Sequence, residues 1–545
     1  MLRPDRAAGR AMAEANRPAE ARAFVLRAAV AALENGRYQE GERLAGAWMA
    51  QHPLDLEVTL LRGLALAAQG ACTAAAPILL GVAAARPGFA HPCSDLARLL
   101  PQALSLVATQ FRACRRLAPG DDRLTLAYAD MLHEARRPAA AAAVLRALLR
   151  RRPTLATAHR LFGMVLLDLG DPAGSIAALR RATVLAPDDA AAWSNLGVAL
   201  KIEGRFDEAA RAHDHAVALA PADAQVRLNR AVALLRAGRM AEAWPDYEFR
   251  LLIGPPPPLP RATLLPTLAP AEQLGGRTVL AWHEEGFGDT LQFARYLPML
   301  AARGARVVAS VPAPLRRLLA TLAGVDLVTG PPAPVPDHDW HCPLFSLPRV
   351  FATTLETIPA AVPYLHADPG ERAAWASLLP AEGVRVGLVW AGQARPWLPG
   401  FAALDERRSL PLRALKPLAA VPGVRLVALQ AGPAAEQARA LPAGLFAAEP
   451  MPDVHDFAAT AAIIANLDVV VSVDTAVAHL AGALGRTVFL LDRYDSCWRW
   501  LAGRRRSPWY PTLRIFRQTR MDDWAPVIAA VATALTALAH RRMRG

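Results

Sequence analysis

The apolar residues of this 545-residue chain follow two patterns, and the change lies near the middle. Up to about Leu252, apolar positions recur at helical spacing and proline returns at a nearly fixed interval. Farther along, they gather in short β-rich runs separated by stretches long enough for helices. The first pattern predicts packed helices, and the second predicts strands alternating with helices.

Prolines mark the period of the first half. They stand 34 residues apart, except for the 32 between the second and third, at Pro53, Pro87, Pro119, Pro153, Pro187 and Pro221. This is the period of the tetratricopeptide repeat (TPR), a helix–turn–helix unit. The clearest unit runs from Ala190 to Asp223, with the repeat's expected residue types at Trp193, Leu196, Gly197, Leu200, Gly204, Ala209, Ala216 and Pro221.

Turn glycines between paired helices recur as Gly36, Gly70, Gly170, Gly204 and Gly238. We therefore predict a tail over residues 1–21 and six to seven repeats over residues 22–252, of which the unit at about Gly88 to Asp121 is shortened and weak. The concave side of such a solenoid suits an extended peptide or another protein. A spacer or a self-association surface is the alternative.

A stiff proline-rich linker is expected over residues 253–273, because prolines cluster from Pro255 to Pro258 and return at Pro260 and Pro266. The apolar runs beyond it are Thr278–Trp282, Arg306–Val311, Val384–Trp390, Val424–Gln430, Asp468–Val473 and Arg486–Leu491. Buried strands alternating with helices predict parallel sheets. The expected fold is multidomain: an all-α TPR solenoid, then an α/β unit of two Rossmann-like lobes, residues 274–370 and 371–545. Ligands of such sheets bind beyond the carboxyl ends of the strands.

The first lobe opens with a strand that leads into a glycine turn, His283-Glu-Glu-Gly-Phe-Gly-Asp289, and then a helix over about Thr290 to Arg303. Gly286 and Gly288 allow a close approach of backbone to a ligand, and a helix N-terminus favours negative charge. Asp289 is either a helix cap or a general base.

The second lobe repeats this order of strand, polar turn and helix around Asp474 and Thr475. Both side chains can hydrogen-bond a hydroxyl or a phosphate, and the helix N-terminus favours a diphosphate. His479 follows one helical turn later, either as a packed core residue or as a ligand-binding group.

These strings resemble the heptosyltransferase-like glycosyltransferases of GT-B fold, family 9. The sequences Trp282-His-Glu-Glu-Gly-Phe-Gly-Asp-Thr-Leu-Gln-Phe-Ala-Arg-Tyr-Leu-Pro and Ser472-Val-Asp-Thr-Ala-Val-Ala-His-Leu-Ala-Gly-Ala-Leu-Gly look like their bacterial TPR-containing branch, as do Trp498-Arg-Trp-Leu and Ser507-Pro-Trp-Tyr-Pro-Thr. The resemblance implies that Asp289 deprotonates the acceptor hydroxyl, that Asp474, Thr475 and His479 hold the donor's diphosphate and sugar, and that transfer inverts the anomeric centre. Many heptosyltransferases have glycine where this chain has Ala476, so an ADP-heptose donor is not implied.

Further donor-binding candidates at strand ends are Gly288, Trp390, Gln430 and Arg408. Arg408 is the best cation for a leaving diphosphate, with a solvated arginine as the alternative. The segment Asp337-His-Asp-Trp-His-Cys342 contains D-x-D but follows a run of prolines, which favours a structural or acceptor-side loop. Asp453, His455 and Asp456 indicate a helix start. We therefore expect no metal and no cofactor beyond the nucleotide sugar as co-substrate.

Composition narrows the remaining classes. The net charge of +13 raises nucleic acid as a partner, but the arginines are spread along the chain, which disfavours it. Five scattered cysteines without C-x-x-C spacing, no signal-like start and no apolar segment of about 20 residues predict a cytoplasmic protein without a membrane span.

The function expected is transfer of a sugar from a nucleotide diphosphate sugar to a protein or saccharide acceptor that the TPR array recruits. An enzyme resembling protein O-GlcNAc transferase is one alternative. A non-catalytic TPR adaptor with a nucleotide-binding α/β unit is the other.

Overall fold

The computed structural model describes residues 18–69, 122–134, 136–253, 259–393, 404–440 and 444–544, with a few positions between 71 and 78. These form two compact units, and the division lies inside the helical array, between Pro187 and Asp188. The turn glycine Gly70 and the weak repeat at about Gly88 to Asp121 lie outside the described residues.

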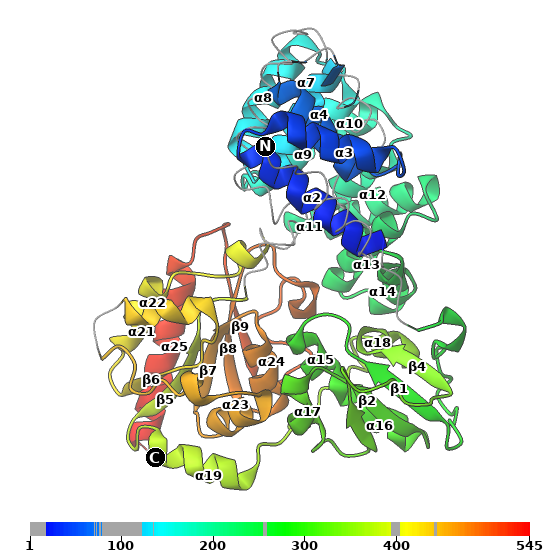
Figure 1. Ribbon diagram of the computed structural model, residues 1–545. Helices are drawn as coiled ribbons and strands as arrows, with labels where there is room; N and C mark the ends of the chain where they lie inside the picture. Colours follow the sequence, from blue (N-terminus) through cyan, green and yellow to red (C-terminus); the bar gives the residue numbers. More distant parts are fainter. Residues whose placement is uncertain are drawn as a thin grey trace, which may run out of the picture. The chain divides into compact units, whose positions relative to one another are not determined.

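The first unit consists of helices that pack on their neighbours in the chain (Figure 1). They are α2 (Pro18–Glu34), α3 (Tyr38–Met49), α4 (Leu56–Ala68), α7 (Asp122–Glu134), α8 (Pro138–Arg151), α9 (Ala156–Asp168) and α10 (Pro172–Leu185). Gly36 and Gly170 have φ angles of 71° and 74°, as the predicted turns require. Arg136 has a φ of 58° 34 residues before Gly170, so one turn adopts this conformation without glycine.

The second unit begins with the last repeats, α11 (Ala190–Ile202), α12 (Phe206–Leu219), α13 (Ala224–Ala237) and α14 (Met240–Tyr247), and a 3₁₀ turn η1 (Glu248–Leu252). Leu235, Trp244 and Tyr247 belong to the same apolar core as the α/β residues that follow. Trp244 Nε1 also donates a hydrogen bond to the carbonyl oxygen of Thr353 (2.7 Å). The end of the array is therefore a structural part of the α/β unit.

The N-terminal lobe contains a parallel sheet with strand order β3-β2-β1-β4. Its strands are β1 (Thr278–Trp282), β2 (Arg306–Ser310), β3 (Leu327–Thr329) and β4 (Trp340–Pro343); its helices are α15 (Phe287–Phe293), α16 (Leu297–Ala302), α17 (Ala313–Leu319) and α18 (Leu347–Val350). The single helix expected over Thr290 to Arg303 is instead two helices joined by a 3₁₀ turn, Ala294–Tyr296, just before Pro298.

The C-terminal lobe contains a second parallel sheet with strand order β6-β5-β7-β8-β9. Its strands are β5 (Val384–Val389), β6 (Val424–Ala428), β7 (Val469–Val473), β8 (Thr487–Asp492) and β9 (Leu513–Arg517); its helices are α19 (Pro369–Leu378), α21 (Lys416–Ala419), α22 (Glu436–Arg439), α23 (Phe457–Ile464), α24 (Ala476–Ala483) and α25 (Ala525–Arg544). Val531 and Leu535 of α25 pack with Val386 and Val471 of the sheet, so this helix covers one face of the sheet (Figure 1). Among the described residues, no helix has the length and apolar character needed to cross a membrane.

The predicted plan of TPR-type helices followed by two Rossmann-like parallel lobes is confirmed. We predicted a loop over Asp337–Cys342. This prediction is wrong for its last residues, because Trp340–Pro343 form β4 and pair with β1.

Candidate functional site

Asp289 lies in the first turn of α15, directly beyond the carboxyl end of β1. Its Oδ2 accepts a hydrogen bond from the backbone N–H of Gly286 (3.0 Å), which closes the turn. His283, in the same turn, contacts Thr290 through Nδ1 (2.7 Å to Oγ1). The cap role considered for Asp289 is thus present in the structure. Each carboxylate oxygen has two acceptor sites, so the cap leaves capacity for another hydrogen bond.

Arg499 is the ion-pair partner of Asp289. Its Nη2 lies 2.5 Å from Asp289 Oδ1, and its Nε donates to Gln292 Oε1 (2.9 Å). The guanidinium is buried and lies over the ring of Trp498, 4.6 Å from the centroid. Burial lowers the pKa of Arg499, but the charge of Asp289 and smaller contributions from Cys497 and Tyr247 together outweigh burial, so the pKa stands above its ordinary value.

Gly288 brings the two strand-end motifs together. A β-carbon at this position would lie 2.8 Å from His479 Cδ2 and 3.3 Å from the Cα of Ala476. Any side chain here would therefore clash with the start of α24. The N-terminal turn of α15, with Asp289, lies directly against the N-terminal turn of α24.

Asp474 and His479 form a partly buried pair at this point. His479 Nε2 lies 3.8 Å from Asp474 Oδ1, and its Nδ1 is 3.1 Å from the hydroxyl of Tyr510. The imidazole also stacks on Trp500, with ring centroids 5.2 Å apart. Although burial raises the pKa of Asp474, the neighbouring His479 and the charges of Arg493 and Arg408 hold it well below its usual range. Asp474 is therefore held as a carboxylate.

Thr475 is the N-cap residue of α24, with extended backbone, and makes no capping hydrogen bond with its side chain. Its Oγ1 instead lies 3.0 Å from Ser472 Oγ. The first N–H groups of a helix lack intrahelical partners and favour an anionic group. This N-terminus is the part of the site best suited to a phosphate.

Arg408 reaches the same strand ends from the loop after β5. It pairs with Asp405 (2.7 Å) and donates to the carbonyl oxygen of Asp474 (3.2 Å). A β-carbon at Gly392 would lie 2.3 Å from Arg408 Nε, so the glycine of the Trp390-Ala-Gly-Gln393 motif makes room for this guanidinium.

Gln430 and Trp390 have structural contacts. Gln430 Oε1 accepts from the backbone N–H groups of Trp390 and Ala391, and its Nε2 donates to the carbonyls of Ala391 and Ala431. The amide thus ties the ends of β5 and β6 together. The ring of Trp390 is fully buried and stacks on Phe446 at 5.8 Å. In this conformation, the Trp390 ring belongs to the lobe's core.

The two segments that contain residue types able to bind a metal, 337–342 and 453–456, make other contacts. Asp339 accepts a hydrogen bond from the backbone N–H of Thr278, and His341 contacts the carbonyl of Pro260 and accepts from Trp282 Nε1. Asp456 caps α23, which confirms the helix start predicted there. Among the described residues, one group has metal-like spacing: Asp130, His133 and Glu134 of the first unit.

Sequence reasoning missed Arg499 and Glu285. Glu285 lies between Glu284 and Gly286, four residues before Asp289, and loss of hydration together with the charges of Asp289 and Glu284 raises its pKa. Arg499 lies in the string Trp498-Arg-Trp-Leu, which was noted only for its resemblance. An arginine between two tryptophans was the signal available in the sequence.

Comparison with known proteins separates the two halves of the chain. A tetratricopeptide repeat family model matches residues 26–88, 160–214 and 203–253. The chain is thus a repeat protein whose N-terminal region is built of tetratricopeptide repeats and precedes two parallel α/β lobes.

The particular relatives are more distant. Protein FlbA of Caulobacter vibrioides is 29% identical over 293 residues, 48% of this chain and 47% of FlbA, so the match spans about half the length of that curated relative. Among solved structures, ADP-heptose LPS heptosyltransferase II of E. coli is similar over 48% of this chain and 99% of its own, with 14% identity and a TM-score of 0.36. MamA of Desulfovibrio magneticus RS-1 is similar over 30% of this chain and 96% of its own, with 19% identity and a TM-score of 0.26.

Proposed function

We propose that this protein is a glycosyltransferase that moves a sugar from a nucleotide diphosphate sugar to a protein or saccharide acceptor recruited by its repeats. The observation that carries the proposal is the contact of Gly288 with Ala476 and His479. It puts a carboxylate from one lobe beside a helix N-terminus of the other, each beyond the carboxyl end of its sheet.

In the proposed reaction, Asp289 accepts the proton of the acceptor hydroxyl while that oxygen attacks the anomeric carbon. The bond from this carbon to the diphosphate breaks, and the leaving group takes the electron pair. Arg408 and the N-terminus of α24 stabilise the charge that develops there. Asp474 and His479 orient the donor. Attack opposite the leaving group would invert the anomeric centre.

Two substitutions separate the two tasks. Asp289→Asn keeps the shape and removes proton acceptance, so turnover should fall roughly 10²–10⁴-fold while donor affinity hardly changes. Asp474→Ala should weaken donor binding directly. Thermal shift with a panel of nucleotide sugars identifies the donor, and calorimetric titration with initial rates measures both effects.

Asp368→Asn is a matched control, because Asp368 also caps a helix, α19, but is exposed and far along the chain from these motifs. Normal turnover of the Asp289→Asn protein would reduce Asp289 to a cap. Activity in EDTA tests the proposed metal independence. Loss in EDTA that Mn²⁺ or Mg²⁺ restores would overturn it.

A non-catalytic adaptor is the second candidate. The contacts of Asp289 favour it, since Arg499 already engages one carboxylate oxygen and the backbone N–H of Gly286 engages the other. A wild-type protein that binds a nucleotide sugar but neither hydrolyses nor transfers it would support the adaptor.

A further inference from the structure

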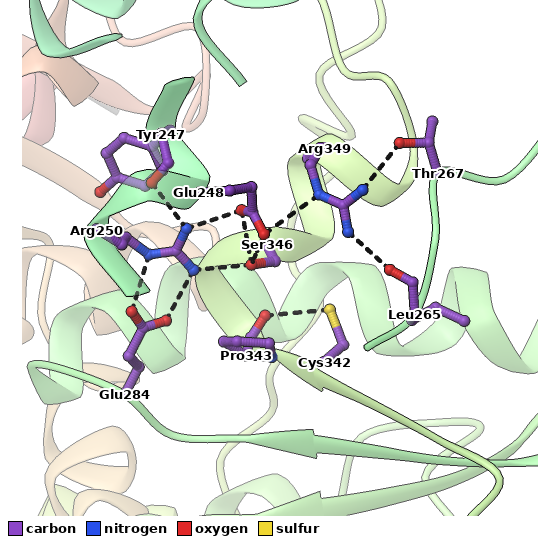
Figure 2. A network of polar contacts seen from close by, with 10 residues as sticks. All are labelled: Tyr247, Glu248, Arg250, Leu265, Thr267, Glu284, Cys342, Pro343, Ser346 and Arg349. Carbon is purple, nitrogen blue, oxygen red and sulfur yellow. Dashed lines mark hydrogen bonds and ion pairs between the residues drawn. The ribbon is translucent and has the colours of Figure 1, made fainter. Parts of the chain in front are cut away.

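The end of the helical array contacts the turn that carries Asp289. Arg250, in η1, donates from Nε and Nη2 to the two carboxylate oxygens of Glu284 (2.8 and 2.9 Å), as Figure 2 shows. Glu284 lies between β1 and α15, in the turn that leads to Asp289. A two-point arginine–carboxylate pair fixes orientation as well as distance.

This pair is the centre of a larger buried network. Arg250 also donates to Glu248 and to the hydroxyl of Ser346, both at 2.8 Å. Glu248 in turn pairs with Arg349 (3.4 Å), so two arginines balance two glutamates (Figure 2). The exposed fractions of the Arg250, Glu248 and Glu284 side chains are only 8%, 12% and 13%.

The guanidinium of Arg250 is buried and remains charged. Burial alone lowers the pKa of its guanidinium, but the charges of Glu284 and Glu248 raise it above its ordinary value. Removing one member of a buried pair leaves the other charge without its partner, which strongly favours rearrangement. We therefore expect that without Arg250 the Glu284 carboxylate turns toward water and the β1–α15 turn shifts with it.

A second set of contacts reaches the other side of Asp289. Trp244 and Tyr247 of α14 meet the ring of Trp498 edge-on, with centroids 6.0 and 5.9 Å apart. The next residue, Arg499, is the ion-pair partner of Asp289. The same end of the array therefore contacts both the turn that carries Asp289 and the segment that holds its carboxylate.

We propose that Arg250 is a positioning residue for Asp289 and acts through Glu284. The last repeat then shapes the reactive site itself, in addition to any binding of acceptor by the array. The link to catalysis rests on the proposed function, whereas the link to the conformation of the turn does not.

Hydrogen exchange of the full chain tests the positioning directly. In Arg250→Gln, amides of residues 283–290 should exchange at least about tenfold faster than in wild type, while peptides of α23 stay unchanged. Arg239→Gln is the matched control: Arg239 precedes α14 and forms an exposed pair with Glu242. Its loss should leave residues 283–290 unchanged.

The kinetic arm uses the nucleotide sugar found by thermal shift. Arg250→Gln should lower kcat about tenfold and change the donor Kd less than about twofold. Arg250→Lys should recover part of kcat, because a lysine keeps the charge but cannot bridge Glu284, Glu248 and Ser346 with one planar group.

Each outcome of the exchange experiment supports or overturns the positioning role of Arg250. Unchanged exchange at residues 283–290 in Arg250→Gln, or equal acceleration in Arg239→Gln, overturns the proposal. If Arg250→Gln does not fold, Glu284→Gln removes the same pair from the other side and must accelerate exchange in the same segment alone. If wild type binds no nucleotide sugar, the proposed function fails, and exchange still decides the positioning role.

Discussion

Replacing His213 by leucine should stabilise the protein, and more so in acid. The imidazole, in α12, is fully buried, and neither ring nitrogen has a hydrogen-bond partner in the described structure. Burial, with smaller contributions from Lys201 and Arg230, lowers its pKa to about 3. The folded protein therefore keeps His213 neutral at both pH 7 and pH 5.

The chain itself contains a precedent for leucine at this place. A β-carbon at Gly197 would lie 2.5 Å from the His213 ring, and one at Gly163 would lie 2.5 Å from Leu179. The two pairs are one 34-residue period apart. Leucine therefore packs against the equivalent glycine one repeat earlier, so His213→Leu should fit without strain.

The expected gain in the free energy of unfolding for His213→Leu has a constant part and a pH-dependent part. An unpaired buried donor costs about 1–3 kcal/mol, so a gain of about 1–2 kcal/mol is expected at pH 7. The unfolded chain binds the proton near pH 6.5 and the folded chain only near pH 3, so wild-type stability is lost as the pH falls. At pH 5, about 1.5 units below the unfolded value, this loss is about 2 kcal/mol. The advantage of the leucine variant should then reach about 3–4 kcal/mol.

Urea unfolding followed by circular dichroism at pH 7 and pH 5 measures this difference. His215→Gln is the control, because His215 is exposed on the same helix. An advantage of His213→Leu that stays constant, or shrinks, between pH 7 and pH 5 would refute the reasoning.

Two further substitutions test charges that folding disfavours. Burial, then the charge of Arg236, lowers the pKa of Lys201 to about 8, so its contribution to stability is lost as the pH falls from 10.5 through 8. Lys201→Met should therefore raise the Tm at pH 7 and have little effect at pH 10, and an equal shift at both would contradict this. Loss of hydration, then the charge of Asp130, raises the pKa of Glu134 to about 7, so stability is lost as the pH rises from 4.5 to 7. Because Glu134 is at the surface, screening limits the gain from Glu134→Gln to about 1 kcal/mol at pH 8, with none at pH 4; denaturant unfolding at both pH values checks it.

The repeats and the central strands could be predicted from sequence because each depends on a local pattern. In two successive repeats a glycine, Gly163 or Gly197, packs against a larger side chain 16 residues later, and strands buried on both faces appear as continuous apolar runs. The sequence did not predict β3 and β9, for two different reasons. β3 has only three residues, and β9 alternates apolar residues with arginines, as an edge strand can.

The candidate site was less predictable, since its contacts join distant parts of the chain. Strand-end position and resemblance pointed to Asp289 and Asp474. The ion pair of Asp289 with Arg499 joins residues 210 positions apart, and no local sequence pattern predicts it. Gln430 shows the reverse: it stands at a strand end, yet all its amide groups bind backbone.

The division of the chain between Pro187 and Asp188 has a consequence for how such a protein can diversify. The contacts that support the turn of Asp289 come from Trp244, Tyr247 and Arg250, all downstream of this division. Each of those contacts joins two residues of the second unit, so the repeats upstream of the division supply none of their side chains. Under the proposed function, chimaeras joined at this boundary would exchange the upstream repeats that recruit the acceptor and keep the residues that support the turn of Asp289.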